Sequence, residues 1–281
     1  MGPSLARGEP TGLRVRIASA VALAPLPLAA IWFEGAWLMS VAALAGTAMA
    51  WEWGRLCRGE VGRGFAAGAV EITLISVVLA TVLISAAGAE GVAVAVAVIG
   101  SGVIFAMARQ RPGGEPLLTA LGALWIAIPC ISFLWLARAE HGGREILLWL
   151  LAVVWATDIG AYAIGRSIGG PRLAPRWSPR KTWAGFVGGM VCAALAGGTA
   201  ALALRVPPVL PLVLASTGLA IVAQLGDLAE SLAKRRFGVK DSSGLIPGHG
   251  GLLDRLDGLL AVIPVVALTT WISGHDVLLW R

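Results

Sequence analysis

Charged residues are scarce in this chain of 281 residues, at 14% of the sequence, whereas hydrophobic residues make up 57%. A soluble domain carries about 25% charged residues. This deficit excludes an ordinary soluble enzyme and predicts an integral membrane protein with several spans. The spans use up the length, so we expect no separate soluble domain.

Cysteine is also scarce, and the three cysteines (Cys57, Cys130 and Cys192) lie far apart in or beside apolar segments. No CxxC or Cys/His spacing is present, so they are expected to be small core residues rather than metal ligands or disulfide partners. The sequence also contains no nucleic-acid-binding motif. We therefore expect no nucleic-acid partner, despite the formal net charge of +6.

Long apolar segments dominate the rest of the chain. A membrane span needs about 20 mainly apolar residues, and nine segments meet this need: 14–32, 36–53, 66–87, 91–108, 117–138, 145–166, 183–204, 208–232 and 252–274. The first resembles a signal peptide but lacks an obvious cleavage site, so we expect a retained anchor. The pairs Gly188-Gly189 and Gly197-Gly198 predict close helix packing. We expect an all-α, polytopic bundle of about nine transmembrane helices.

The distribution of Lys and Arg predicts the orientation of this bundle. If alternate loops lie on the same side, the side of the N-terminus collects 18 of the 22 basic residues: Arg7, Arg14, Arg16, Arg55, Arg58, Arg63, Arg109, Arg111, Arg166, Arg172, Arg176, Arg180, Lys181, Lys234, Arg235, Arg236, Lys240 and Arg255. By the positive-inside rule this side is cytoplasmic. The N-terminus is therefore expected inside and the C-terminus outside. The abundance of Ala, Gly and Arg suggests a bacterial plasma (inner) membrane.

Aspartate is absent from the first 157 residues, whereas five of the six aspartates lie between positions 158 and 257. Ionisable groups in or beside a span are costly and usually mark function. We therefore divide the chain into a scaffold of transmembrane helices at 1–140 and a part at 141–281 that carries the catalytic loops.

The segment 226–258 is the most densely charged part of the second half. Asp227, Glu230, Ser231 and Lys234 share one helix face by their spacing. Asp254 and Asp257 open the following helix, where carboxylates also favour the helix dipole. The simpler alternatives are a salt-bridge ladder and helix capping. Three carboxylates that face one another would instead form an oxygen-rich site of the kind that Mg²⁺ prefers.

Two basic loops are predicted on the same membrane face. The loop 235–251 is rich in glycine and serine, so its backbone N–H groups suit phosphate oxygens, although a basic loop that touches anionic lipid headgroups is an alternative. The segment 155–189 places Asp158 inside an apolar helix, and a basic loop follows it. Ser178-Pro179-Arg180-Lys181-Thr182 then leads into a helix whose N-terminus suits an anion. We expect the two loops to meet around a nucleotide.

The residues of these segments resemble a known family. The run S-x-x-K-R-x-x-x-x-K-D-x-S-x-x-I-P-x-H-G-G-L-x-D-R-L-D from Ser231 to Asp257 is similar to the signature of the phosphatidate cytidylyltransferase (CDP-diacylglycerol synthase) family. The D-x-G-A-Y and S-P-R-K-T-W segments resemble its second block. Ala184 departs from the family, in which many members have Glu, so no carboxylate role is carried over to that position.

The resemblance implies CTP and phosphatidate as substrates, and CDP-diacylglycerol and diphosphate as products. It also implies Mg²⁺ together with a second cation, a homodimer, and contact with membrane lipids. It implies metal ligands at Asp227, Asp254 and Asp257. The resemblance and the pattern of charges together predict these catalytic residues: Asp227, Lys234, Arg235, Lys240, Asp241, His249, Asp254 and Asp257. The expected substrate-binding set is Asp158, Ser178, Arg180, Lys181, Thr182, Ser231, Gly250, Gly251 and Arg255.

Two other functions remain open at this point. A CTP-dependent polyprenol or lipid kinase would also use basic loops for CTP, but it would transfer the γ-phosphate. A cation transporter would use Asp158 and Asp227 as intramembrane ligands. The transporter would not explain the PGHGG loop, and the lack of a convincing internal repeat counts against many transporter folds.

Overall fold

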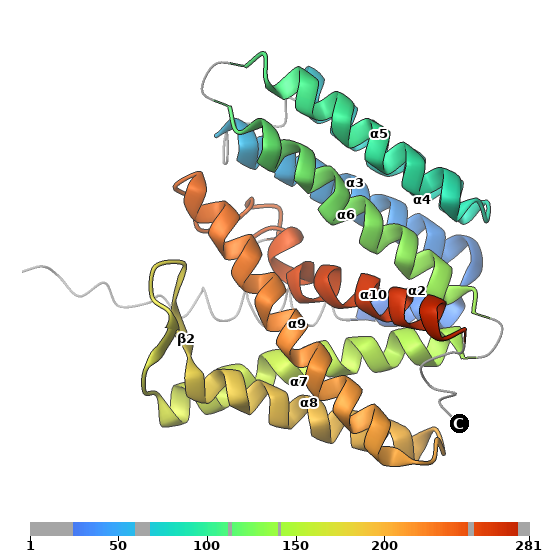
Figure 1. Ribbon diagram of the computed structural model, residues 1–281, viewed down its shortest axis with the longest axis vertical. Coiled ribbons are helices and arrows are strands. Elements are labelled where there is room, and N and C mark those ends of the chain that lie inside the picture. The colour runs from blue at the N-terminus through green and yellow to red at the C-terminus, as the bar shows by residue number, and fades with distance from the viewer. Residues whose placement is uncertain (1–24, 60–67, 112–113, 140–141, 247–249, 275–281) are drawn as a thin grey trace, which may run out of the picture.

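The computed structural model describes residues 25–59, 68–111, 114–139, 142–246 and 250–274. Within these ranges the protein is almost entirely helical (Figure 1). The elements are α2 (Pro25–Phe33), α3 (Gly35–Arg58), α4 (Ala69–Ala86), α5 (Glu90–Ala108), α6 (Pro116–Ala137), α7 (Gly143–Ile168), β1 (Arg172–Ala174), β2 (Ser178–Thr182), α8 (Trp183–Ala203), α9 (Val209–Arg236) and α10 (Leu253–Ser273). The expected all-α class is confirmed.

Seven of the described helices, α4 to α10, are long and apolar enough to cross a membrane. They coincide with seven of the nine expected spans, and the protein is a multi-pass membrane protein. The expected span 36–53 is also a helix, α3, of 24 residues. Helix α3 is not among the seven, and its last two turns carry Glu52, Arg55 and Arg58. Of the expected span 14–32 only the part in α2 is described.

Local sequence explains where several helices begin and end. Helix α3 ends at Gly59, whose φ of 70° is left-handed and whose N–H donates to the carbonyl of Leu56 at 3.1 Å. Glycine is favoured there because it has no Cβ to clash. Helix α6 begins with Pro116, which lacks an N–H that would be unpaired in a first turn. Thr182 caps α8, since its hydroxyl accepts a hydrogen bond from Gly185 N at 3.1 Å.

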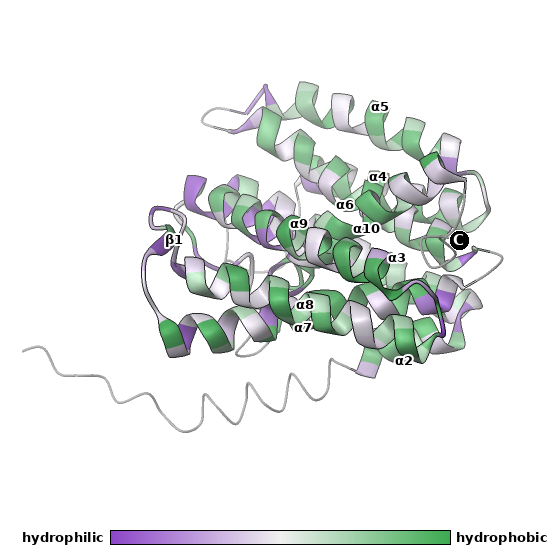
Figure 2. Cartoon of the chain, turned by 60° about the horizontal axis from the view of Figure 1, so that its bottom comes forward, coloured by the Kyte–Doolittle hydropathy of each residue, from purple (hydrophilic) through white to green (hydrophobic). Residues whose placement is uncertain are grey.

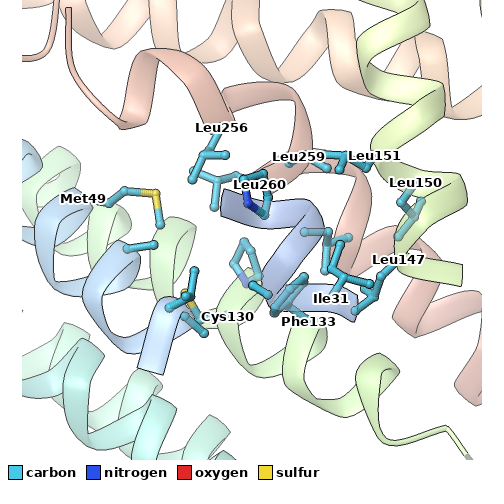
Figure 3. Close-up of a pocket in the computed structure, with 17 residues that line it drawn as sticks. Ile31, Met49, Cys130, Phe133, Leu147, Leu150, Leu151, Leu256, Leu259 and Leu260 are labelled. Carbon is cyan, nitrogen blue, oxygen red and sulfur yellow. The ribbon is translucent and has the colours of Figure 1, made fainter. Parts of the chain in front are cut away.

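The helices form two groups that meet at α10. Helices α3 to α6 pack on one another, α7 to α9 form a second group, and α10 contacts α6 of the first group and α9 of the second (Figure 1). Buried residues of α10 belong to both hydrophobic clusters: Leu253 and Leu260 to one, Val262 and Val266 to the other. A small apolar cavity of about 130 Å³ lies between α2, α3, α6, α7 and α10 (Figure 3). No charged side chain lines this cavity, so it cannot neutralise a phosphate group.

The expected close packing at the glycine pairs is confirmed. A Cβ on Gly188 would lie 2.6 Å from the Cβ of Ile164 on α7, and one on Gly197 would lie 2.2 Å from Ser216 Oγ on α9. Real Cβ atoms do not approach so closely, so these glycines let α8 pack against both neighbours. The three cysteines are free, as expected.

The segment between α7 and α8 was expected to be a loop, but part of it forms an antiparallel hairpin. Strand β1 pairs with β2, with Arg172 opposite Thr182 and Ala174 opposite Ser178. The hairpin is short, and Arg235 Nε at the end of α9 donates to the carbonyl of Trp177 in its turn at 3.2 Å. This contact joins the two basic segments that the sequence placed on one face.

Ion pairs group the helix ends into two opposite sets. At the basic end, Arg236 Nε of α9 lies 2.7 Å from Glu115 Oε1, just before α6, and Arg58 pairs with Glu71 at the start of α4. At the other end Arg138 pairs with Glu90. Figure 2 shows the hydrophobic bodies of the helices between more hydrophilic ends. The alternation of loops used to predict the topology is therefore reproduced in the fold.

Candidate active site

A polar cavity of about 880 Å³ lies between α7, the hairpin, α8 and α9. Its charged side chains come from segments far apart in the sequence, and four of them are basic. They are Asp158, Arg166, Arg172, Arg180, Lys181 and Asp227. A volume of this size is typical of a pocket for a small molecule. The excess of positive charge indicates an anionic ligand.

The two acidic residues of the cavity lie on facing helices, Asp158 on α7 and Asp227 on α9. Their carboxylates are close enough to repel each other. Lys181, from β2, reduces this repulsion because its Nζ lies 2.6 Å from Asp227 Oδ2. The same Nζ is 3.4 Å from the carbonyl oxygen of Gln224. The structure thus brings Asp158, Lys181 and Asp227 together, as the sequence predicted.

The polar stripe on α9 is present, and it links two parts of the site. Ser231 Oγ donates to Asp227 Oδ1 at 3.3 Å, on the side of the cavity. Lys234 is 8% exposed, and its Nζ lies 3.1 Å from Glu230 Oε1 and 2.5 Å from Asp254 Oδ1. The salt-bridge ladder that the sequence offered as an alternative is therefore real at Lys234, where it also connects α9 to α10.

Asp254 shapes the loop between α9 and α10. Its Oδ2 accepts hydrogen bonds from Gly251 N at 2.8 Å, from Ser242 N at 2.9 Å and from Ser242 Oγ at 3.0 Å. With Lys234 on Oδ1, both carboxylate oxygens already have partners. Asp254 thus holds the two ends of the loop 242–251 together.

Glu52 is a part of this site that the sequence patterns did not reveal. It is 0% exposed, on α3 of the half that was expected to be scaffold only. It accepts hydrogen bonds from Ser243 Oγ at 2.6 Å, Leu252 N at 2.8 Å and Leu253 N at 2.8 Å. Ser242 Oγ lies 3.3 Å from Glu52 Oε2 and shares its one hydroxyl hydrogen between Glu52 and Asp254. Two of the donors are backbone N–H groups at the start of α10, so Glu52 satisfies a helix N-terminus from another helix.

Residues 242 and 243 and residues 250–253 fit tightly around Glu52 and Asp254. A Cβ on Gly251 would lie 1.9 Å from Ser242 Oγ and 2.7 Å from Glu52 Oε1, so a larger residue would displace the serine hydroxyl or the carboxylate. Gly250 has a φ of +82°, and a Cβ on it would lie 2.8 Å from Asp254 Oδ2. Two of the glycines predicted to bind phosphate through their N–H groups, Gly250 and Gly251, therefore have a structural reason to be present, and Gly251 N already donates to Asp254.

Asp257 lies one turn after Asp254 and belongs to a second acidic group. Its carboxylate interacts electrostatically with Asp227, Glu230 and Asp158. Glu230 is 2% exposed, and its Oε2 is buried with no hydrogen-bond partner among the described residues. Of the four carboxylates only Glu230 is buried, whereas Asp227 and Asp257 are half-buried and Asp158 is exposed. Carboxylates this close together favour a compensating positive charge.

The other predicted residues have varied positions. Lys240 and Asp241 are exposed on the loop after α9, and Arg235 contacts the hairpin turn. Thr182 caps α8 and also lines the cavity. The rest of the set is placed as follows: Ser178 in β2, Gly250 in an isolated bridge with Ile246, Arg255 exposed and within electrostatic reach of Asp158, and His249 outside the described residues.

The predicted metal ligands can be compared with the geometry of the site. Among the described residues no three His, Cys, Asp or Glu side chains lie close enough to hold one ion. The oxygen donors of Asp227 and Asp257, which repel each other, fit a hard cation such as Mg²⁺ whose shell substrate phosphates complete. Asp254 fits only after it releases Lys234. Its assignment as a ligand stays a prediction.

The sequence did contain a signal that could have pointed to Glu52. The cost of an ionisable group inside an apolar segment, which drew attention to Asp158, applies equally to Glu52 and to the buried Glu71. Glu71 pairs with Arg58 and Arg111 and contacts neither the cavity nor the loop. Only the fold tells the two glutamates apart.

These features define a class of protein: a multi-pass membrane protein whose polar cavity is lined by four basic and two acidic side chains and lies at the basic end of its helices. Comparison with known proteins is more specific. Residues 14–273 match the cytidylyltransferase family, and the chain belongs to this family. Membership favours nucleotidyl transfer over the kinase and transporter alternatives.

The curated relatives agree with this assignment, and two of them align over more than nine tenths of their length. A phosphatidate cytidylyltransferase of Brucella suis biovar 1 (strain 1330) is 37% identical over 266 residues, which cover 92% of this chain and 93% of the relative. One from Pseudomonas aeruginosa is 36% identical over 274 residues, 93% of this chain and 98% of the relative. One from Bacillus subtilis (strain 168) is 40% identical over 145 residues, about half of each chain.

Proposed function

We propose that this protein is a phosphatidate cytidylyltransferase, which converts CTP and phosphatidate to CDP-diacylglycerol and diphosphate. The relatives of Brucella suis and Pseudomonas aeruginosa carry this name and align over more than nine tenths of the chain. The observation that carries the proposal is the cavity, in which four basic side chains and two carboxylates gather at the basic end of a membrane bundle.

The reaction joins two polyanions. An oxygen of the phosphatidate phosphate attacks the α-phosphorus of CTP, and a new P–O bond forms. The bond from the α-phosphorus to the oxygen that bridges to the β-phosphorus breaks, and diphosphate leaves with that electron pair. Because a phosphate monoester is largely dianionic at pH 7, its second pKa being about 6, the nucleophile needs no general base.

The chain's own part is to bind, orient and neutralise. Arg166, Arg172, Arg180 and Lys181 line the cavity and would neutralise the phosphates of CTP and of the lipid. Positioning and electrostatic stabilisation supply most of the acceleration in phosphoryl chemistry. Lys181 has a second task, because it keeps Asp227 paired until the substrates bind.

Mg²⁺ would be held by Asp227 and Asp257. Asp254, the predicted third ligand, would have to leave Lys234 and move toward them, because both of its oxygens already have partners. When bound, the cation supplies charge neutralisation for the triphosphate and for the leaving diphosphate. A second cation, which the family resemblance implies, has no assigned ligands.

The proposal includes the setting of the enzyme. We place it in the plasma (inner) membrane of a bacterium as a homodimer, with the cavity on the cytoplasmic side. The positive-inside rule supports this orientation, because the cavity lies at the end of the bundle that carries most of the Lys and Arg residues. Cross-linking in native membranes tests the dimer.

The test of the reaction uses purified protein in detergent with phosphatidate, Mg²⁺ and CTP that is labelled at the α- or at the γ-phosphate. Label from the α-position in the extracted lipid supports cytidylyl transfer. Label from the γ-position in the lipid would establish a lipid kinase instead. No labelled lipid from either CTP would refute the proposal.

Asp227→Asn and Asp254→Asn should each lower kcat at least about 100-fold, the scale of loss for one preorganised electrostatic group. Glu90→Gln is the matched control, because Glu90 pairs with Arg138 at the opposite end of the bundle. It should keep wild-type turnover. Near wild-type turnover in either Asp variant would refute the role of that residue.

A further inference from the structure

Gln224 of α9 lines the polar cavity, although no step of the reaction requires an amide there. The residue is 5% exposed and lies twelve residues before the end of α9 at Arg236. Twelve residues of helix span roughly 18 Å, so the carboxamide lies well inside the bundle. Polar groups at such a depth in a membrane protein are costly and usually mark function.

The hydrogen bonds of Gln224 fix the orientation of its carboxamide. Its Nε2 donates to the carbonyl oxygen of Phe186 on α8 at 3.3 Å and to that of Ala220, one turn earlier on α9, at 3.1 Å. Carbonyl oxygens only accept hydrogen bonds, so turning the amide round would place its own oxygen against two acceptors. The nitrogen of Gln224 is therefore held against α8 and α9.

The oxygen of the same carboxamide is left for a ligand. No described residue donates a hydrogen bond to Gln224 Oε1, and this oxygen is not fully enclosed by protein. Because Gln224 lines the cavity, Oε1 is open to the cavity. The side chain thus offers a ligand one acceptor in a fixed direction and no donor.

The surroundings of Gln224 suit a nucleotide. Lys181 Nζ lies 2.6 Å from Asp227 Oδ2 and 3.4 Å from the carbonyl oxygen of Gln224, so a cation that can bind phosphate is its direct neighbour. Phe186 and Tyr162 line the same cavity, and aromatic rings stack on bases. A nucleotide with a phosphate on Lys181 places its base, one ribose away, within reach of Gln224.

The lone acceptor selects among the groups that a nucleotide carries. Ionised phosphates offer only acceptors, so they do not bind Oε1. Cytosine has an N4 amine, which donates, whereas uracil has an acceptor, O4, at the same place. Ribose hydroxyls also donate, but they are the same in CTP and UTP, and the neighbouring aromatic rings favour the base over the ribose at this point.

We infer that Gln224 Oε1 accepts a hydrogen bond from the N4 amine of CTP and thereby selects cytosine over uracil. This inference rests on the proposed function, because it takes CTP as the occupant of the cavity. Uracil in the same position would place its O4 against Oε1, two acceptors with no proton between them.

The test uses the full chain in detergent with phosphatidate, Mg²⁺ and four nucleotides. They are CTP, UTP, dCTP, which lacks the 2′-hydroxyl, and the triphosphate of pyrimidin-2-one riboside, which carries hydrogen in place of the N4 amine. Gln224→Met keeps the length of the side chain and removes the acceptor. Ser216→Ala is the matched control: Ser216 is 0% exposed on the same helix, accepts from Trp149 Nε1 of α7 at 3.0 Å, and does not line the cavity.

Wild-type kcat/KM should be at least about 100-fold higher for CTP than for UTP, because a site built to bind an N–H group rejects an analogue without it. It should be about 2- to 10-fold higher for CTP than for the amine-free analogue, the loss of one hydrogen bond. Gln224→Met should lower the value for CTP by that same 2- to 10-fold and change the value for the amine-free analogue less than about twofold. Ser216→Ala should lower Tm and keep every ratio between nucleotides.

Several results would overturn the inference. Equal use of CTP and the amine-free analogue by the wild type would do so without any variant, even if Gln224→Met does not fold. An equal loss for both nucleotides in Gln224→Met would show that Gln224 only ties α9 to α8. A loss for CTP that disappears with dCTP would assign the acceptor to the ribose.

The same assay separates this inference from the proposed function. If the wild type forms no nucleotide-linked lipid from any of the four nucleotides, the proposed function fails and the inference fails with it. An active wild type, together with a Gln224→Met variant that keeps the preference for CTP over UTP, refutes the inference alone.

Discussion

Glu52 offers the most direct test of whether the N-terminal half takes part in catalysis. Its two carboxylate oxygens each accept one serine hydroxyl and one backbone N–H: Oε1 from Ser243 and Leu252, Oε2 from Ser242 and Leu253. The change Glu52→Gln keeps the shape of the side chain. It also removes the charge and replaces one oxygen with an NH₂ group.

The cost follows from the donors around Glu52. Whichever way the amide of Gln is oriented, its oxygen keeps one serine and one N–H, and its NH₂ group faces the other pair. The serine hydroxyl there can rotate and accept, but the backbone N–H of Leu252 or Leu253 is left without an acceptor. An unsatisfied buried donor costs about 1–3 kcal/mol. If this lowers the population of the correctly placed loop, kcat falls about 5- to 150-fold.

The assay measures kcat, the KM for both substrates, and Tm in detergent. We expect kcat to fall with little change in either KM, because the loop that carries Ser242 and Gly251 is misplaced while the cavity that binds the substrates is intact. Glu71→Gln is the matched control: Glu71 is equally buried, at 0% exposed, and pairs with Arg58 and Arg111 away from the loop. It should lower Tm and leave kcat near wild type.

The control makes the reasoning refutable. If Glu52→Gln and Glu71→Gln lower Tm equally and both keep kcat, Glu52 has only a structural role. If both variants lose kcat in parallel with Tm, the loss reflects stability and not the position of the loop.

Two further predictions come from the site. Gly251→Ala should abolish measurable turnover in protein that still inserts in the membrane, because the new Cβ would lie 1.9 Å from Ser242 Oγ and would displace the loop from Glu52; Gly244→Ala, where a Cβ meets nothing within 4 Å, is the control and should remain active. Lys181→Met should raise the KM for CTP about tenfold or more, since a cavity cation that contributes a charge-assisted hydrogen bond of about 1.5–3 kcal/mol is lost. Activity assays at varied CTP check this value, and an unchanged KM would contradict the place of CTP in the cavity.

Much of the membrane architecture could be predicted from residue order because bilayer physics acts on segments. Seven of the nine expected spans are long apolar helices, and α3 coincides with one more, the expected segment 36–53. The positions of Asp158, Lys181 and Asp227 on one cavity were also predicted, since the alternation of loops places the ends of α7 and α9 on one side. The signature from Ser231 to Asp257 indicates the family through residue identity and spacing alone.

Other parts of the site depend on contacts that no local pattern encodes. Glu52 lies 190 residues before Ser242 in the chain, and only the packing of α3 against the start of α10 brings them together. Asp254 was expected to face a metal, yet in the fold it holds Lys234 and the loop. An apolar groove of about 690 Å³ lies between α6 and α9, because both helices pack on α10 but make few contacts with each other.

The sequence by itself thus determined that the chain crosses a membrane several times, which end of the bundle is basic, and to which family it belongs. These properties follow from hydropathy, charge and residue identity along the chain. The tertiary structure decided which carboxylate holds a loop, which one faces the cavity, and which apolar faces remain open to lipid. These depend on distances between helices, because hydrogen bonds and ion pairs act only within a few ångströms.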